Sequence, residues 1–223
     1  YTMPQGSLAG THPFARRFDG ESRRAEQTLY VATMLRSSGF QPDIIVVHSG
    51  WGEAMPLRAV FPQARIVVYG EYFYRSRESD VNFDPEFPEL GLDGLVGLHA
   101  RNAASLLALA DCDLAISPTR WQRSTFPAEF QSKIRTVHEG IDTRLVAPDL
   151  TATLRLDDGS IVRAGDEIVT FVARNLEPLR GYHIFMRALP SILKERPQAR
   201  VLIVGTMPSA ASLAAAEYYA HKR

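Results

Sequence analysis

The fold is decided by the stretch FVARNLEPLRGYHIFMRAL, residues 171–189. Its apolar start predicts a buried strand, and the periodicity after Gly181 predicts an amphipathic helix. The turn between the two carries Arg174 and Arg180. Two guanidinium groups near a helix N-terminus can hold a diphosphate, because charge-assisted hydrogen bonds and the helix dipole both favour negative charge there. The alternative is an ordinary strand-loop-helix unit whose arginines are solvated.

This stretch resembles the start of the second domain in retaining glycosyltransferases of family 4 (glycosyl transferase group 1), which have the GT-B architecture of two Rossmann-like domains. In that family a strand ends in a Gly-Arg-Leu-like triplet, and a Lys-Gly or Arg-Gly pair then opens the helix. Ala173-Arg174-Asn175 stands at the triplet and Arg180-Gly181 at the pair. Ala173 replaces the usual glycine, and Arg180 replaces the commoner lysine. The resemblance implies that Arg174, Arg180 and Gly181 bind the donor diphosphate.

A second strand is predicted within PDIIVVHSGWGEA, residues 42–54, because a short apolar run with a glycine-rich exit is typical of a buried parallel strand. His48 stands at its carboxyl end, and Glu53 follows it. Ligands in open α/β sheets bind at the carboxyl ends of strands. The resemblance implies that His48 faces the acceptor and the donor sugar, which makes His48 and Glu53 catalytic candidates. The competing interpretation is a strand-end histidine bound to a backbone carbonyl.

The stretch ARIVVYGEYFYR, residues 64–75, predicts a further strand that ends at Gly70 and Glu71. Glu71 is the third catalytic candidate, for orienting the acceptor or handling a proton. The aromatic residues here either stack on a sugar or a lipid-like acceptor, or pack under a neighbouring helix. They are Tyr69, Tyr72, Phe73 and Tyr74.

The rest of this half predicts one helix over 92–111, a strand over 112–117 and a helix that opens at Trp121. Residues 133–149 resemble the crossing between the two family domains, where Gly140 is retained. The resemblance makes Gly140 a donor-site candidate, whereas on residue type alone it is a turn glycine with a positive φ.

The predicted fold class is therefore α/β of the GT-B type, with two domains. Residues 1–148 form an acceptor-side Rossmann-like domain, and residues 149–223 form the beginning of a nucleotide-sugar-binding domain that opens with a hairpin at 151–165. A helix is expected from Tyr182 to Glu195, with a kink at Pro190. The family's opening strand with its glycine-rich loop and its later glutamate pair are not found, so we expect the chain to be incomplete at both ends.

Composition narrows the class of protein further. The 25 basic and 25 acidic residues cancel, which argues against nucleic acid as a partner. A single cysteine, Cys112, suits a reducing compartment, and scattered histidines give no support for a metal site. We expect a cytoplasmic protein without a cofactor or metal. Peripheral membrane association is a secondary interpretation of an arginine cluster flanked by Phe14 and Phe18. The cluster comprises Arg16, Arg17, Arg23 and Arg24.

The resemblance implies transfer of a sugar from a nucleotide-diphosphate sugar to a hydroxyl of a saccharide or lipid-linked acceptor. It implies retention of anomeric configuration and a place in bacterial glycan or glycolipid synthesis. One alternative is a non-catalytic fragment that folds and binds glycan or lipid without turnover. Another is a sugar-nucleotide epimerase on the same scaffold.

Overall fold

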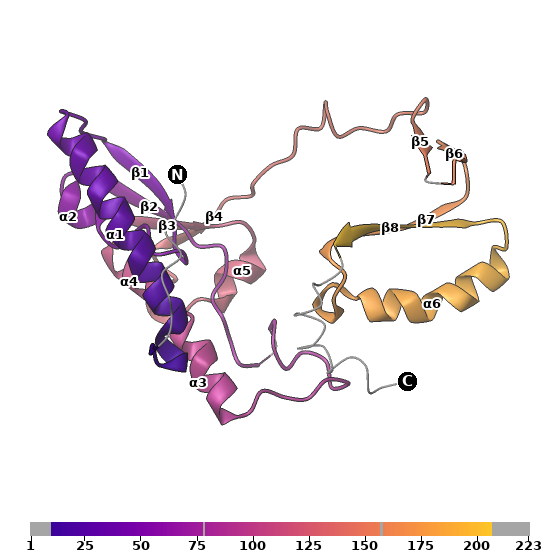
Figure 1. The fold of residues 1–223 in the computed structure, drawn as a ribbon. Coiled ribbons are helices and arrows are strands. Elements are labelled where there is room, and N and C mark those ends of the chain that lie inside the picture. Colours follow the sequence, from indigo (N-terminus) through magenta and orange to yellow (C-terminus); the bar gives the residue numbers. More distant parts are fainter. Residues whose placement is uncertain (1–9, 78, 157, 207–223) are drawn as a thin grey trace. The chain divides into compact units, whose positions relative to one another are not determined.

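The computed structural model describes residues 10–77, 79–156 and 158–206. The chain divides into two compact units, Tyr1–Gly140 and Ile141–Arg223, and each is described by itself (Figure 1). The sequence predicted a domain boundary between residues 148 and 149. In the structure, the segment from Ile141 onward is grouped with the second unit.

The first unit is built on a sheet of four parallel strands in the order β1-β2-β3-β4. In register, His48 of β1 lies beside Tyr69 of β2, Tyr69 lies beside Ile116 of β3, and Ser117 of β3 lies beside Thr136 of β4. The four carboxyl ends therefore meet at one edge of the sheet. The strands are β1 (Ile44–His48), β2 (Arg65–Tyr69), β3 (Leu114–Ser117) and β4 (Ile134–Thr136).

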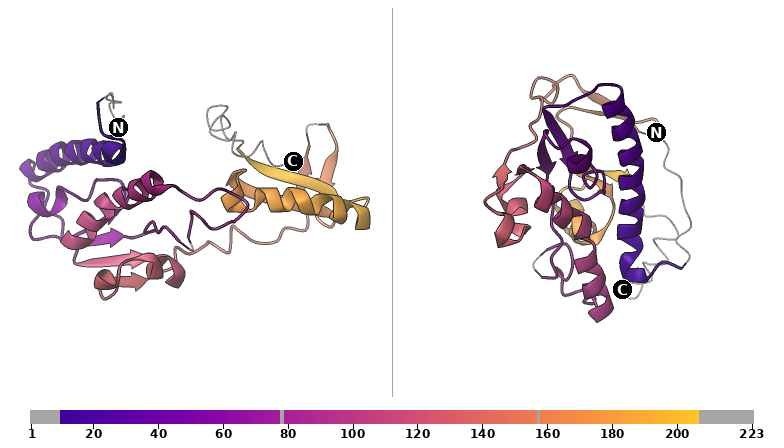
Figure 2. Two further views of the ribbon diagram at one scale, coloured as in Figure 1. Left: turned by 90° about the horizontal axis from the view of Figure 1, so that it is seen from below. Right: turned by 90° about the vertical axis from the view of Figure 1, so that its left-hand side faces the viewer.

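The sheet is accompanied by helices, of which α1 and α4 lie side by side (Figure 2). The apolar core includes Val68 and Ala115 of the sheet together with Leu109 of α4, all fully buried. Cys112 is also part of this core, and burial raises the pKa of its thiol. The helices of this unit are η1 (Pro13–Ala15), α1 (Arg16–Ser37), α2 (Leu57–Val60), α3 (Leu92–Ala100), α4 (Ala103–Asp111), α5 (Arg120–Thr125) and η2 (Ala128–Phe130).

The expectation of one helix over 92–111 is wrong, because α3 and α4 are separated by Arg101 and Asn102. Asn102 is 4% exposed, and both polar atoms of its side chain bind the backbone of Tyr74. An apolar pattern of helical period runs through both helices and so does not reveal the break. The cause is a buried polar contact with a distant loop.

Gly52, in the loop after β1, has a φ of +98° and lies against the backbone of Glu21 in α1. A Cβ at this position would overlap the Glu21 carbonyl oxygen. The Glu21 carboxylate is buried and receives a hydrogen bond of 2.7 Å from Arg17 Nε, while its second oxygen has no hydrogen-bond partner among the described residues. Burial is the main reason why the pKa of Glu21 is raised. This close approach joins α1 to the loop that follows His48.

We predict that Gly52→Ala destabilises the protein by about 1–3 kcal/mol more than Gly39→Ala does, because overpacking adds to backbone strain. Gly39 is the matched control: its φ is +92°, but an added Cβ would meet nothing within 4 Å. Both variants carry the strain of a positive φ, about 1–2 kcal/mol. Urea unfolding measures the two losses, and equal losses would contradict a tight contact at Gly52.

Asp113 connects the amino ends of β2 and β3. Its carboxylate accepts hydrogen bonds from the Ile66 backbone N–H at 2.8 Å, from Arg58 Nη2 at 2.7 Å and from Arg65 Nη1 at 3.3 Å. The Ile66 hydrogen bond, followed by that from Arg58, lowers the pKa of Asp113 to about 2. The ionised carboxylate thus holds the neighbouring strand in register.

Because the folded pKa of Asp113 lies below its unfolded value of about 3.9, its contribution to stability is present above that value and lost as the pH falls towards 2. We predict that Asp113→Asn is less stable than the wild type at neutral pH, and that the difference narrows as the solution is acidified. Urea unfolding across an acidic pH series measures this difference. A gap that does not change with pH would show that the charge of Asp113 plays no part.

The second unit contains an antiparallel pair and a parallel pair of strands. β5 (Thr153–Arg155) and β6 (Ile161–Arg163) form the predicted hairpin, although Asp157 in its turn lies outside the described residues. β7 (Ile168–Asn175) runs parallel to β8 (Arg200–Thr206), and the connection contains η3 (Pro178–Arg180) and α6 (Tyr182–Glu195). The predicted bounds of α6 are confirmed, and the helix continues without interruption through Pro190.

This strand-helix-strand unit is held by aromatic packing. Phe171 of β7 contacts Tyr182 and Phe185 of α6, with ring centroids 5.5 Å and 4.9 Å apart. Because Tyr182 is the first residue of α6 and Phe185 belongs to the same turn, these contacts fix the N-terminal end of the helix on the strand. Of the two candidate arginines, Arg174 lies in β7, next to its last residue, and Arg180 ends η3 in the connection to α6.

Candidate active site

His48 occupies the carboxyl end of β1, and its two ring nitrogens have different partners. Nδ1 accepts a hydrogen bond from the Gly50 backbone N–H at 3.1 Å, and Nε2 lies 3.2 Å from Glu71 Oε2. Since Nδ1 accepts, the ring proton belongs on Nε2 and is donated to Glu71. The competing interpretation of a histidine bound to a backbone carbonyl is wrong, because the backbone partner is an N–H group.

Glu71 reaches His48 from the neighbouring strand, two residues beyond the end of β2. Its side chain is 57% exposed and that of His48 is 30% exposed, so the pair opens to solvent. The His48 ring also contacts Trp51 and Tyr69, with centroids 5.7 Å and 5.6 Å apart. The second Glu71 oxygen can therefore accept a hydrogen bond from a polar ligand, and the His48 Nε2–H can donate to a ligand that takes the place of Glu71.

Tyr69 joins this edge to the segment after β4, where its hydroxyl donates a hydrogen bond to Glu139. Desolvation, followed by this hydrogen bond, raises the pKa of Tyr69 to about 12. The phenol is therefore neutral over the whole physiological range and serves as a donor. The sequence singled out Tyr69 only as an aromatic residue and gave no signal for its pairing with Glu139.

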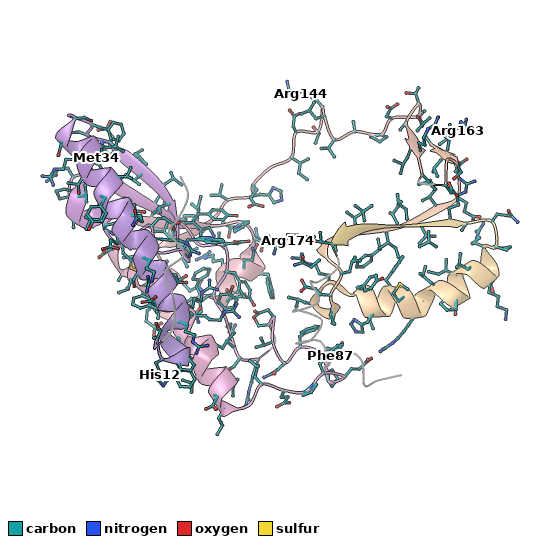
Figure 3. All side chains as sticks on the ribbon, viewed as in Figure 1. His12, Met34, Phe87, Arg144, Arg163 and Arg174 are labelled. Carbon is teal, nitrogen blue, oxygen red and sulfur yellow. The ribbon has the colours of Figure 1, made fainter. Side chains whose placement is uncertain are left out.

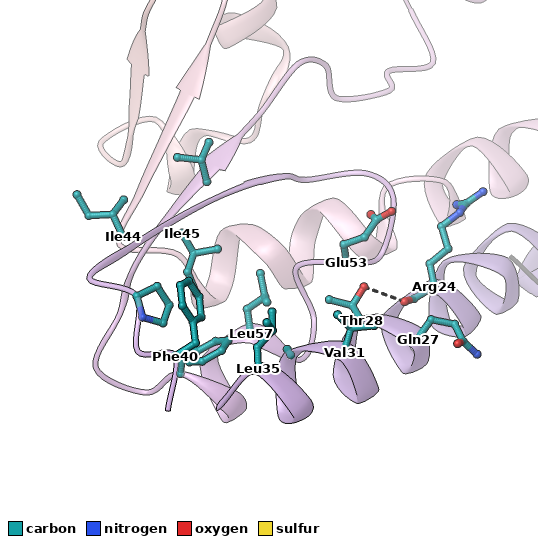
Figure 4. Close-up of a pocket in the computed structure, with 14 residues that line it drawn as sticks. Arg24, Gln27, Thr28, Val31, Leu35, Phe40, Ile44, Ile45, Glu53 and Leu57 are labelled. Atoms are coloured by element: carbon teal, nitrogen blue, oxygen red, sulfur yellow. Dashed lines mark hydrogen bonds between the residues drawn. The ribbon is translucent and has the colours of Figure 1, made fainter. Parts of the chain in front are cut away.

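Glu53 stands apart from the pair, since no hydrogen bond in the described part of the chain joins it to His48 or Glu71. It lines a pocket of about 740 Å³ between α1 and β1 (Figure 4). Its Oε2 is buried and has no hydrogen-bond partner within the described structure. The rest of the wall is mainly apolar, with Val31 and Leu35 from α1 and Ile45 from β1 among its members.

The aromatic residues after β2 differ in their surroundings, and their stacking on a sugar or lipid-like acceptor stays a prediction. Phe73 packs against the core beside Phe126, with centroids 5.6 Å apart. Tyr72 stacks instead on Trp121, with centroids 5.8 Å and planes 28° apart, and meets Tyr74 edge to face at 5.4 Å. One aromatic residue thus anchors the loop, while two belong to a surface cluster.

Buried polar side chains hold this loop in place. The Asn102 amide accepts a hydrogen bond from the Tyr74 N–H and donates one to the Tyr74 carbonyl, each at 2.9 Å. Thr125 Oγ1 accepts the Phe73 N–H at 3.2 Å. The guanidinium carbon of Arg101 lies 4.5 Å from the Tyr74 ring centroid. The loop is therefore positioned by side chains from α4, α5 and their flanks.

We predict that Asn102→Ala lowers stability by about 1–3 kcal/mol, because it leaves polar backbone groups of Tyr74 without their partners. Asn102→Asp is the matched control, since it keeps the acceptor for the Tyr74 N–H and loses the donor. Urea unfolding and hydrogen exchange of the Tyr74 amide measure the effect. Unchanged exchange at Tyr74 in Asn102→Ala would contradict the anchoring role.

The donor-side candidates lie together in sequence at the carboxyl end of β7. Arg174 is exposed near this strand end (Figure 3), and its carbonyl accepts a hydrogen bond from the Thr206 hydroxyl. Arg180 is also exposed, and its Nε lies 3.4 Å from Glu177 Oε1. Gly181 has a φ of +75° and immediately precedes α6. Its left-handed conformation lets the chain turn from η3 into the helix.

Gly140 lies in the first unit, where it has a φ of +80° and donates its N–H to His138 Nδ1 at 2.9 Å. These features agree with a turn glycine; its proposed donor contact stays a prediction. Among the described residues no group of three or more histidine, cysteine, aspartate or glutamate side chains is arranged to hold a metal ion. Within the same residues, no helix combines the length and apolar character needed to cross a membrane.

A parallel α/β sheet with its polar candidates at the carboxyl edge, followed by a second strand-helix-strand unit, defines a fold of the GT-B class. Residues 1–146 match the "glycosyl transferase family 4 group", and the chain belongs to this family. The catalytic domain of Starch Synthase IV from Arabidopsis thaliana, bound to ADP and acarbose, is a structural neighbour. The TM-score is 0.52 at 17% sequence identity, over 96% of this chain and 51% of that chain.

Two curated relatives match parts of the chain. Spore coat protein SA of Bacillus subtilis (strain 168) is 33% identical over 92 residues, which are 37% of this chain and 22% of the relative. The second relative is the GDP-mannose-dependent alpha-(1-6)-phosphatidylinositol monomannoside mannosyltransferase of Mycolicibacterium smegmatis (strain ATCC 700084 / mc(2)155). It is 31% identical over 100 residues, which are 44% of this chain and 26% of the relative. The matched region thus spans about a quarter of the length of these relatives.

Proposed function

We propose that this chain is part of an enzyme that transfers a sugar from a nucleotide-diphosphate sugar to an acceptor hydroxyl, with retention of anomeric configuration. The observation that carries the proposal is the His48–Glu71 pair at the carboxyl edge of a sheet in a family 4 glycosyltransferase. Open α/β sheets bind their ligands at this edge. The mannosyltransferase relative favours a transferase over an epimerase.

On the acceptor side, Glu71 orients His48 and keeps the ring proton on Nε2, because the Gly50 N–H already occupies Nδ1. When substrate binds, the Nε2–H of His48 exchanges Glu71 for an oxygen of the transferring sugar or of the acceptor, and His48 forms no covalent bond. Glu71 retains a second carboxylate oxygen with which to accept a hydrogen bond from a hydroxyl. Glu53, at the separate pocket, acts at a distance from this chemistry.

On the donor side, charge builds up on the diphosphate as its bond to the sugar breaks. Arg174 and Arg180 stabilise that charge, together with the N-terminal end of α6. Arg180 has a carboxylate partner in Glu177, so it exchanges that ion pair for the phosphate when the donor binds. Because arginine supplies the positive charge, the proposed reaction requires no metal ion.

The substrate classes follow from the relatives in part. A GDP-mannose-dependent relative and an ADP-bound structural neighbour support a nucleotide-diphosphate donor. We propose a saccharide or lipid-linked acceptor in bacterial glycan or glycolipid synthesis and a cytoplasmic site of action. The phosphatidylinositol in the mannosyltransferase name supports an acceptor at a membrane surface.

We predict that Arg180→Ala in the complete protein lowers kcat for sugar transfer by about 10²–10³-fold, the usual cost of removing one preorganised charge contact. His48→Ala is expected to lower it by about 10²-fold or more. Arg196→Ala is the matched control. Arg196 follows the opposite end of α6 and likewise pairs with a carboxylate, Glu167, at 3.1 Å.

Release of nucleoside diphosphate from a panel of nucleotide-diphosphate sugars, with and without added acceptor, measures the rates. Equal rates of sugar transfer for Arg180→Ala and Arg196→Ala would contradict the proposal that Arg180 binds the donor diphosphate. Absence of transfer in the wild-type protein across the panel would overturn the proposed reaction and favour the non-catalytic alternative.

A further inference from the structure

Trp121 is an exposed aromatic residue close to the His48–Glu71 edge, and the chemistry described so far does not use it. It is the second residue of α5, which begins directly after the turn that follows β3. The side chain of Thr119 accepts the Gln122 N–H at 3.0 Å and so caps this helix. Because β3 neighbours β2 in the sheet, Trp121 belongs to the same carboxyl edge as Glu71.

Tyr72 gives the Trp121 ring a rigid support. The two rings stack with planes 28° apart, and Tyr74 contacts Tyr72 edge to face at 86°. The Tyr72 hydroxyl donates to Asp80 Oδ1 at 3.2 Å and is also hydrogen-bonded to Ser79. Tyr72 is therefore held at both its ring and its hydroxyl, and it supports one face of the Trp121 ring.

Trp121 nevertheless remains 57% exposed. A large ring that is braced from one side and open to solvent is available for contact with a ligand. The surroundings show which kind of ligand fits, since α5 has the sequence RWQRST and Trp121 is its one apolar residue. A membrane or protein interface needs a continuous apolar patch, whereas an exposed aromatic ring beside tyrosine hydroxyls and the polar residues of α5 suits a ligand that is itself amphipathic.

A pyranose ring has this character, because its C–H groups form an apolar face and its hydroxyl groups form a polar rim. Gln122 is the next residue of α5, and Asp80 accepts a hydrogen bond from the Tyr72 hydroxyl, so both supply polar groups for the rim of such a ring. Glu71, which pairs with His48, follows the adjacent strand β2 at the same edge of the sheet.

We propose that Trp121, supported by Tyr72, is the stacking platform for a pyranose ring of a saccharide acceptor. This inference deepens the proposed function and rests on it, since it names the acceptor class and a residue that binds it. Trp121 acts in binding and orientation, and it takes no part in proton transfer.

The chain offers a direct probe, because it contains two tryptophans, Trp51 and Trp121. Each gives one indole N–H resonance in a ¹⁵N-correlated NMR spectrum, and Trp51→Phe and Trp121→Phe assign the two. The ligands are methyl α-glucopyranoside, methyl α-mannopyranoside and methyl α-galactopyranoside, titrated separately, with glycerol as a polyol that lacks a ring face. We expect at least one pyranoside to shift the Trp121 indole resonance in a saturable manner, and glycerol not to do so.

The matched variants are Trp121→Ala and Trp121→Phe, monitored through backbone amides of the same edge. We expect Trp121→Ala to weaken pyranoside binding by about tenfold or more, and Trp121→Phe to retain part of the affinity, because stacking requires an aromatic face. Dispersed amide resonances elsewhere in the spectrum show that each variant is folded. A Trp121 indole that responds to none of the three pyranosides, or binding that Trp121→Ala leaves unchanged, would overturn the platform.

These titrations need neither donor nor turnover, so they separate this inference from the proposed reaction. Loss of transfer in Arg180→Ala with an unchanged pyranoside titration is the expected result when both hold. Transfer without any Trp121 response would overturn the platform alone. A saturable Trp121 response in a protein that transfers no sugar would support the platform as a glycan-binding surface and remove the reaction.

Discussion

The parallel pairing of β1 with β2 is the interaction on which the first unit depends. It places His48 beside Tyr69 and lets the next residues of both strands leave the sheet at the same edge. Glu71 can meet His48 only because the two strands run in the same direction and in this register. A slip of one residue would turn every side chain of a strand to the opposite face and separate the pair. Asp113 opposes such a slip at the other edge through its hydrogen bond to the Ile66 N–H.

The loops at this edge are held by contacts with helices. Gly52 lies against the backbone of α1, which fixes the loop after His48, and Asn102 binds the loop after Glu71. The first contact packs a glycine with a positive φ against the backbone of α1, and the second pairs a buried side-chain amide with the backbone of the loop. Glu21 shows the cost: its carboxylate is buried, its pKa is raised, and one of its oxygens has no hydrogen-bond partner in the described part of the chain. Rigid loops around an exposed pair are what a site that orients two substrates requires.

The donor side is built on a different physical basis. Gly181 permits a left-handed turn, after which α6 presents its N-terminal end beside two arginines. Arg180 is paired with Glu177, and we propose that a donor phosphate replaces this carboxylate. In the proposed reaction the two candidate sides differ in chemistry: hydrogen-bonding polar groups and aromatic rings would contact the acceptor, and positive charge would stabilise the leaving group.

Local patterns in the sequence predicted the strands, the hairpin and the bounds of α6, because strand periodicity, turn chemistry and helix termini are local properties. The choice of His48 as a site candidate came from the family resemblance, and its role stays a prediction. The sequence did not separate α3 from α4, since the break comes from the contact of Asn102 with Tyr74, nor did it separate Phe73 from Tyr72 and Tyr74 in their packing. It grouped Glu53 with His48, whereas the path of the chain around Gly52 directs Glu53 to another pocket. These features, and the stacking of Trp121 on Tyr72, were decided only by tertiary structure, because each depends on which distant residues the folded chain brings into contact.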